Sequence, residues 1–77
     1  MSHRPEDKEA LRAIGARLRE AREAAGMTQA EVADALGMTA QAVSGAERKG
    51  IARVALLARF AEALGADPAG IAFGDNA

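Results

Sequence analysis

The chain lacks the residues on which several classes of small protein depend. None of its 77 residues is cysteine, so disulfides and thiolate metal sites are excluded. The single histidine, His3, stands near the N-terminus and cannot form a metal-ligand cluster alone. No apolar run approaches the roughly 20 residues needed to span a bilayer, and no signal-peptide pattern opens the chain. We therefore expect a cytoplasmic protein without a metal, a cofactor or a membrane partner.

Aromatic side chains are also scarce, because Phe60 and Phe73 are the only two. Hydrophobic residues nevertheless make up 49% of the chain, so Ala, Leu, Val and Ile must build the core, which suits closely packed helices. A domain of this size buries only about 60% of its unfolded surface, so it is marginal alone and often gains by dimerising. We expect one domain across residues 1–77, with residues 1–5 and 74–77 flexible.

The formal net charge of −1 is not that of a strongly basic nucleic-acid binder, but the charges are unevenly distributed. Residues 11–25 carry four arginines against two glutamates, and residues 38–53 carry three basic residues against one glutamate. Residues 54–77 instead carry one arginine against three acidic residues. This distribution favours a molecule with one basic side. Ordinary solvated charges on helix faces are the alternative.

The spacing of apolar residues predicts five short helices joined by tight glycine turns, with no strand. Pro5 fits the first position of the first helix, and Gly26 ends that helix, as glycine does just past a helix C-terminus. Asp67 caps a short fifth helix with Pro68 in its first turn. The residues predicted to face the core are Leu11, Ile14, Leu18, Ala21 and Ala25 in the first helix, Val32, Ala33 and Leu36 in the second, Ala42, Val43 and Ala46 in the third, and Val54, Leu57, Phe60, Ala61 and Leu64 in the fourth.

The second and third helices are joined by a short turn that contains Gly37. Thr28 opens the second helix, and Glu31, three residues later, completes a capping box. Thr39 caps the third helix. The sharp turn at Gly37 needs a left-handed backbone, which only glycine adopts at little cost. Two helices of about eight residues in this arrangement are typical of a helix-turn-helix.

This segment resembles the Xre family, which includes Cro and the lambdoid phage repressors. The resemblance rests on the Thr28-Gln29 start, the small Ala33, Gly37 at the turn, Val43, and the Glu47-Arg48 pair near the end of the third helix. The stretch 60–65 looks like the family's fourth helix, so the resemblance runs from about Leu11 to Phe73. It implies an all-α, lambda-repressor-like domain whose third helix enters the major groove of double-stranded DNA.

The resemblance and the side-chain chemistry together give candidate DNA-binding residues. The start of the second helix, with Thr28 and Gln29, can hold a phosphate beside unpaired backbone amides; a plain cap and a surface glutamine are the alternative. In the third helix, Gln41 can bond an adenine edge, Ser44 can bond several base edges, and Ala40 can touch only a thymine methyl. The residues placed for phosphates or neighbouring bases are Thr39, Arg48 and Lys49. Arg53, at the start of the next helix, could reach the DNA backbone.

Gly45 departs from the family pattern, because the family often has a long polar residue at this position. The glycine either allows close approach to DNA or indicates weak direct readout that depends on DNA shape. A third helix so rich in small residues could also pack against another protein.

Two further sets of residues are expected to have structural roles. Arg22 and Glu47 resemble the family's buried ion pair between the first helix and the end of the third; two solvated side chains are the alternative. Leu56, Ile71 and Phe73 could form an apolar patch that marks a two-fold dimer interface. In the alternative, Phe73 folds back onto the core of its own domain.

These observations predict a sequence-specific transcription regulator, a repressor rather than an activator. As a homodimer it would place its recognition helices about 34 Å apart on a near-palindromic operator. Within the family, chains this small resemble restriction–modification controller proteins, small phage repressors and antitoxins. The alternative is a protein-interaction module, such as an antitoxin that ignores DNA and binds a toxin. No nucleophile–base pair or carboxylate pocket can be assembled, so we expect no enzyme and no catalytic residue.

Overall fold

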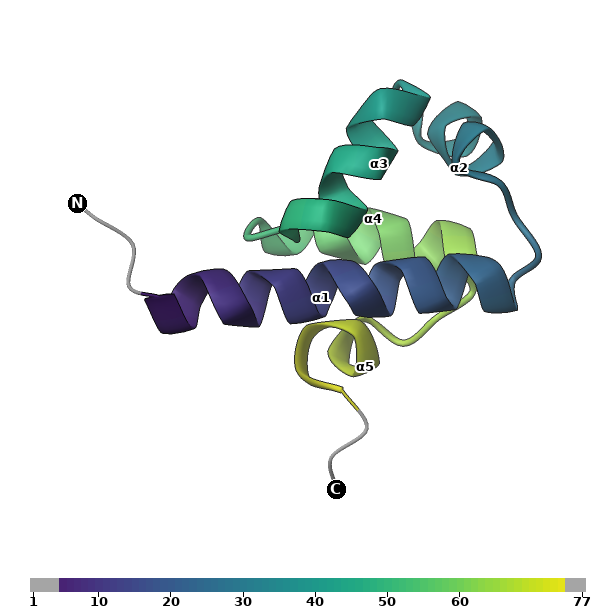
Figure 1. Cartoon of the computed structure of the whole chain (residues 1–77). Helices are drawn as coiled ribbons and strands as arrows, with labels where there is room; N and C mark the ends of the chain where they lie inside the picture. The colour runs from purple at the N-terminus through teal and green to yellow at the C-terminus, as the bar shows by residue number, and fades with distance from the viewer. Residues whose placement is uncertain (1–4, 75–77) are drawn as a thin grey trace.

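The computed structural model describes residues 5–74, which form five α-helices and no strand (Figure 1). The helices are α1 (Pro5–Ala24), α2 (Gln29–Leu36), α3 (Ala40–Lys49), α4 (Val54–Leu64) and α5 (Pro68–Phe73). The predicted all-α fold with five helices is therefore confirmed. The expected flexibility of residues 1–4 and 75–77 concerns residues outside the described range, whereas Pro5 begins α1 and Gly74 caps α5.

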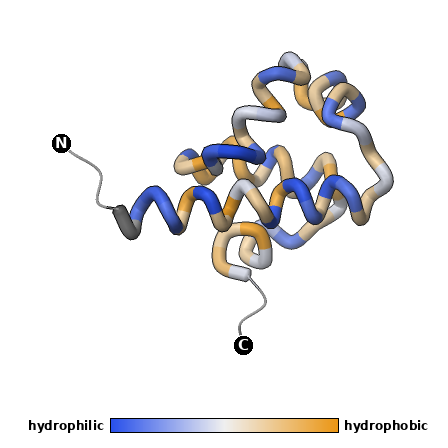
Figure 2. The backbone as a smooth tube through the Cα atoms, viewed as in Figure 1, coloured by the Kyte–Doolittle hydropathy of each residue, from blue (hydrophilic) through white to orange (hydrophobic). Residues whose placement is uncertain are grey.

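The long α1 helix packs against α3, α4 and α5. In the view of Figure 1, α2 and α3 lie on one side of α1, and α5 lies on the other. Groups of hydrophilic and hydrophobic residues follow one another along α1 (Figure 2). Such a succession is expected of an amphipathic helix, in which apolar residues recur every three or four positions. The helix therefore uses its apolar stripe for the core and leaves most of its described charged residues at the surface, Arg17 and Arg22 excepted.

A single apolar core holds the helices together. Phe60, Leu18, Val32 and Val43 are its largest fully buried side chains, and they come from four different helices. The other buried members are Ala33, Leu36, Ile51, Leu57, Ala61, Leu64 and Ile71. The predicted inner stripes of α2 and of the later turns of α4 are therefore confirmed. Burying such aliphatic side chains contributes on the order of 1.5–3 kcal/mol each for the larger ones.

Three predicted core positions are exposed, and a fourth, Leu11, is half-buried outside the core. Val54 is 79% exposed, because it stands in the first turn of α4, before the apolar stripe reaches the core. Ala42 is exposed because α3 turns Val43 and the half-buried Ala46 inward instead. Ala25 is exposed because α1 ends one residue earlier, at Ala24, so this alanine lies in the following turn.

The turn between α2 and α3 depends on a left-handed glycine. Gly37 has φ of +68°, and the N–H of the next residue, Met38, donates to the carbonyl of Ala33 at 2.8 Å. A residue with a Cβ would be strained in this conformation. The geometry ends α2 abruptly and sends the chain at once into α3.

The end of α3 crosses α1 with almost no space between the two backbones. Gly15 is buried in α1, and a Cβ at this position would overlap the carbonyl oxygen of Glu47. A Cβ at Gly50 would likewise overlap the carbonyl oxygen of Leu11. Two glycines therefore permit the crossing that fixes α3 against the N-terminal half of α1.

The short α5 helix is held by an arginine of α1. Arg17 donates from Nε to the carbonyl of Ile71 at 2.6 Å and from Nη2 to the carbonyl of Ala72 at 2.9 Å. Ile71 is buried in the core, which corrects its assignment to an exposed apolar patch. Phe73, by contrast, is 78% exposed, so the alternative in which it folds back onto its own core is wrong.

Candidate nucleic-acid interface

The start of α2 is fixed by the capping box that the sequence predicts. The N–H of Glu31 donates to Oγ1 of Thr28 at 3.1 Å, and the N–H of Thr28 donates to Oε1 of Glu31 at 2.8 Å. The backbone hydrogen bond from Thr28 holds the pKa of the Glu31 carboxyl below its usual value. Thr28 itself is exposed, so this end of α2 faces solvent.

Gln29, in the first turn of α2, has a partner within the fold. Its Nε2 donates to Oε1 of Glu47 at 3.1 Å, and the residue is half-buried. Sequence reasoning assigned Gln29 to a phosphate and missed this contact with α3. An amide group carries two N–H donors, so one hydrogen of Gln29 is left for a ligand.

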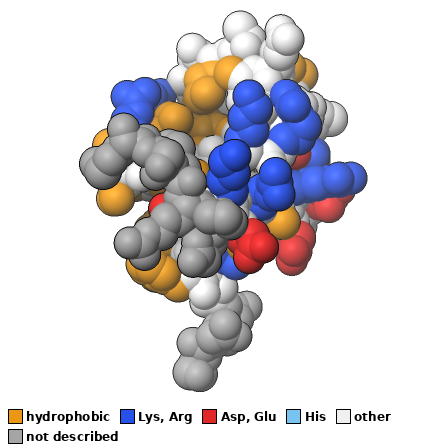
Figure 3. Space-filling view, turned by 60° about the vertical axis from the view of Figure 1, so that its left-hand side comes forward, with side chains coloured by type: hydrophobic (Ala, Val, Ile, Leu, Met, Phe, Trp, Pro, Cys, Tyr) orange, Lys and Arg blue, Asp and Glu red, His pale blue; other side chains and the backbone are white. Residues whose placement is uncertain are grey.

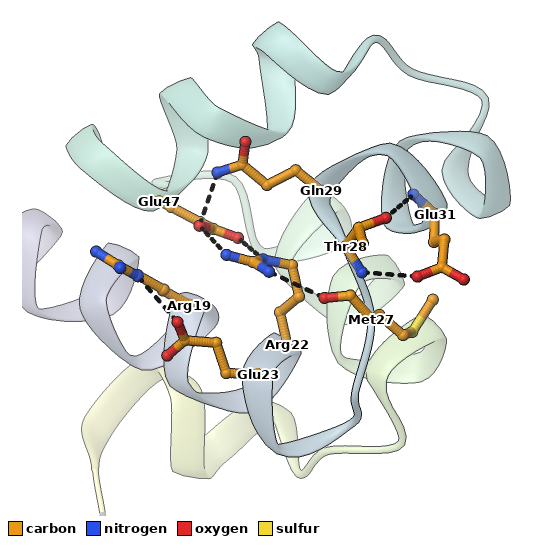
Figure 4. Close-up of polar contacts among 8 residues, drawn as sticks. All are labelled: Arg19, Arg22, Glu23, Met27, Thr28, Gln29, Glu31 and Glu47. Carbon is orange, nitrogen blue, oxygen red and sulfur yellow. Dashed lines mark hydrogen bonds and ion pairs between the residues drawn. The ribbon is translucent and has the colours of Figure 1, made fainter.

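Arg22 and Glu47 form an ion pair at the centre of the same network (Figure 4). Arg22 donates from Nε to Oε2 of Glu47 at 2.6 Å, and from Nη2 to Oε1 at 3.1 Å. Its Nη1 donates to the carbonyl of Met27 at 2.9 Å. The arginine of α1 therefore holds both the loop before α2 and the last turn of α3.

The ion pair shifts the pKa of both partners. The hydrogen bond to Glu47 raises the pKa of Arg22. For Glu47, burial raises the pKa, but hydrogen bonds from Arg22 and Gln29 and the attraction of Arg22 outweigh it and lower the pKa overall. Both groups are therefore charged near neutral pH.

The face of α3 that points away from the core begins with three exposed residues. Thr39, Ala40 and Gln41 are exposed, and Ser44, one turn later, is half-buried. The hydroxyl of Thr39 accepts from the N–H of Ala42 at 3.0 Å and can still donate its own hydrogen. On its opposite side, α3 is anchored by the fully buried Val43. The helix thus stands on the domain surface with its first turn open to a ligand.

This geometry agrees with the comparison to known families. A family model described as a helix-turn-helix domain matches residues 13–73, which is most of the chain. The chain belongs to the helix-turn-helix domain family. Neither a curated protein nor a solved structure matches it significantly. The predicted helix-turn-helix at α2 and α3 is therefore confirmed, and the chain is a DNA-binding protein of this class.

The helix-turn-helix domain also carries basic residues at the end of α3 and beyond it. Arg48, Lys49 and Arg53 are exposed, and none of them has an ion-pair or hydrogen-bond partner among residues 5–74. Lysine and arginine side chains gather on the face shown in Figure 3. The structure thus leaves these three charges available to an anionic partner.

Gly45 is not required by packing within the helix-turn-helix domain. A Cβ at this position would meet nothing closer than Nη2 of Arg48, at 3.9 Å. Gly15, in contrast, has no room for a side chain. The small size of residue 45 therefore has no explanation inside the described fold.

Residues 5–74 contain no group of three or more side chains that could hold a metal ion. Within the same residues, no helix combines the length and the apolar character that crossing a membrane requires.

Proposed function

We propose that this helix-turn-helix protein is a sequence-specific transcription regulator of the Xre type that acts as a repressor. The observation that carries the proposal is the position of α3, anchored through Val43 and Glu47 but exposed at Thr39, Ala40 and Gln41. The major groove of B-DNA is about 12 Å wide and admits one α-helix. A helix held rigidly on one side and open on the other is suited to enter it.

The proposed DNA-binding residues divide into those that contact bases and those that contact phosphates. Gln41 can bond the edge of an adenine through two hydrogen bonds, Ser44 can bond a neighbouring base, and Ala40 can contact a thymine methyl. The remaining assigned residues would bind phosphates and fix the position on the duplex. They are Thr28, Gln29, Thr39, Arg48, Lys49 and Arg53.

The proposal includes a homodimer. Phe73 presents most of its ring to solvent, and Leu56 on α4 is only partly covered. A second copy could bury the ring of Phe73 and pair two α3 helices about 34 Å apart, which is one turn of DNA. Repression then follows from occupancy, because a bound dimer excludes other proteins from the same stretch of DNA.

Selection of bound duplexes from a random pool, at a stated salt concentration, tests the proposal. The wild-type chain should enrich a near-palindrome with half-sites about 10–10.5 base pairs apart. Gln41→Ala should lose discrimination at one position per half-site, by about 1–3 kcal/mol. Arg48→Ala should instead weaken all sequences and reduce the salt slope by about one. If the wild-type chain enriches no sequence, the proposal is wrong.

One feature favours a second candidate, in which α3 serves a protein partner. A mainly apolar hollow beside α3 is lined by Met38, Ala42, Ile51 and Leu56, among others. An antitoxin-like role would use this hollow for a toxin. Co-purification with the product of a neighbouring gene, together with no enrichment of any sequence from the random pool, would support this candidate over the repressor.

A further inference from the structure

The basic side chains between residues 5 and 74 fall into two groups. Four of them have partners inside the fold. Arg17 and Arg59 bind backbone carbonyls, Arg22 binds Glu47, and Arg19 pairs with Glu23 at 3.4 Å. The other five make no hydrogen bond or ion pair within the described residues, and all five are exposed. They are Lys8, Arg12, Arg48, Lys49 and Arg53.

Four of these five unpaired cations come together between two helices. Lys8 and Arg12 of α1 and Arg48 and Lys49 of α3 line one surface hollow of about 270 Å³, together with Leu11. We call these four residues the α1–α3 basic cluster. Arg48 also lines the adjoining hollow that contains Arg22 and Ser44, so the cluster is continuous with the face of α3 proposed to read DNA.

The arrangement follows from the crossing of α3 over α1. Positions 8, 12, 15, 19 and 22 are three or four residues apart and share one face of α1. Gly15 and Arg22 on this face meet the end of α3. Lys8 and Arg12 must therefore lie on the same side of α1, on the turns before the crossing.

The cluster makes no hydrogen bond or ion pair within the described fold. Lys8 and Arg12 are like charges at a spacing of four residues, which is unfavourable on a helix. Arg48 and Lys49 add two more positive charges near them. The acidic residues that adjoin Lys8 in the sequence, Asp7 and Glu9, lie about 100° around the helix on either side. Such a concentration of unpaired cations suits a polyanion that supplies the missing charge.

We propose that the α1–α3 basic cluster binds the phosphate backbone of the DNA strand that passes the C-terminal end of α3. This inference rests on the proposed function, and it adds Lys8 and Arg12 to the DNA-binding residues. A helix in the major groove has a phosphate strand at each wall, so cations beside its last turn meet one of these strands. The cluster also explains how a chain of net charge −1 can attract DNA.

The test compares the wild-type chain with the double variant Lys8→Gln/Arg12→Gln. Binding is measured on a selected operator and on a scrambled duplex, between 50 and 200 mM salt. The salt slope is the steepness with which the logarithm of the binding constant falls as the logarithm of the salt concentration rises. Each lost phosphate contact should reduce this slope by about 0.9, so the slope of the double variant should be about 1.8 smaller than that of the wild type. Affinity at 0.15 M salt should fall on the order of ten-fold or more, equally for both duplexes. Phosphate ethylation should identify one or two positions per half-site that impair the wild type but not this variant.

The matched control is Lys8→Arg/Arg12→Lys, which keeps both charges and should keep the wild-type slope. An unchanged slope in the glutamine variant would overturn the inference and leave the proposed function intact. If the charge-preserving control lost as much of the salt slope as the glutamine variant, the inference would also be overturned, because charge would not be the cause of the loss. If the glutamine variant loses binding to an acidic protein and not to DNA, the cluster serves that protein instead. A wild-type chain that binds no duplex at all would overturn both proposals.

Discussion

Nε of Arg22 lies 2.6 Å from Oε2 of Glu47, although the two residues are 25 positions apart in the sequence. Only 14% of the Arg22 side chain and 6% of the Glu47 side chain are exposed. Gln29 donates to the same carboxylate from α2. The pair therefore joins α1, α2 and α3 at one point, and the orientation of α3 depends on it.

Breaking this ion pair should destabilise the protein by leaving a largely buried charge without its partner. We expect Arg22→Ala or Glu47→Ala to reduce the free energy of unfolding by about 3 kcal/mol, the lower end for a buried pair. The double variant Arg22→Met/Glu47→Leu should cost less than the two single alanine variants together, because it leaves no unpaired charge. Denaturant titrations measure all three, and additive losses would contradict the prediction.

The same carboxylate should make stability dependent on pH in the acid range. Arg22 and Gln29 hold the pKa of Glu47 below its ordinary value of 4.5, despite the opposing effect of burial. The stabilisation is therefore present above pH 4.5 and is lost as the pH falls through the lower pKa of the folded state. In Glu47→Gln, the free energy of unfolding should depend less on pH in this range. Identical acid profiles for this variant and the wild type would show that another carboxyl is responsible.

Two glycines in helices should respond oppositely to a methyl group. Gly15→Ala should destabilise the fold by about 1–3 kcal/mol, because the Cβ would overlap the backbone of α3. Gly45→Ala should stabilise it by roughly 1 kcal/mol, since alanine is the better helix former and the site is open. Thermal unfolding of both variants provides the comparison. If DNA affinity falls in Gly45→Ala while stability rises, the glycine serves close approach to the duplex.

Arg17 should control whether α5 stays docked. Removing its two hydrogen bonds to the carbonyls of Ile71 and Ala72 should cost about 2 kcal/mol. The amides of α5 should exchange with solvent faster in Arg17→Ala than in the wild type, since the helix can open locally. Arg12→Ala is the control, because Arg12 is exposed and has no partner among the described residues. Equal exchange rates in α5 for both variants would show that Arg17 does not hold the helix.

Phe73 should stabilise the proposed dimer without contributing to the stability of the fold. Because the ring is 78% exposed, Phe73→Ser should leave the unfolding free energy within about 0.5 kcal/mol of the wild type. Dimer affinity should fall by about 30-fold or more, as expected for an aromatic residue central to an interface. Sedimentation over a concentration series measures this, with Val54→Ser as the matched exposed control. If only Val54→Ser dissociates the dimer, the interface lies at the start of α4.

The local features of the helix-turn-helix could be predicted because they depend on neighbours in the sequence. Thr28 and Glu31 are three residues apart, and the left-handed turn at Gly37 reflects the backbone preference of a single residue. The predictions for Val54 and Ala42 were wrong because helical spacing alone does not say where a stripe meets the core. The roles of Gly15 and Arg17 were missed, since each depends on a segment more than 30 residues away.

By itself, the sequence determined the five helices, their caps and the glycine turn, because hydrogen bonds and backbone preferences act over a few residues. Only the tertiary structure decided which side chains have partners within the fold and which remain available to a ligand at the surface. Packing turned Arg17 toward α5, buried Ile71 and joined Gln29 to Glu47, while it left Phe73 and the α1–α3 basic cluster at the surface. Whether a side chain is buried or available depends on the approach of distant backbones, which no local pattern encodes.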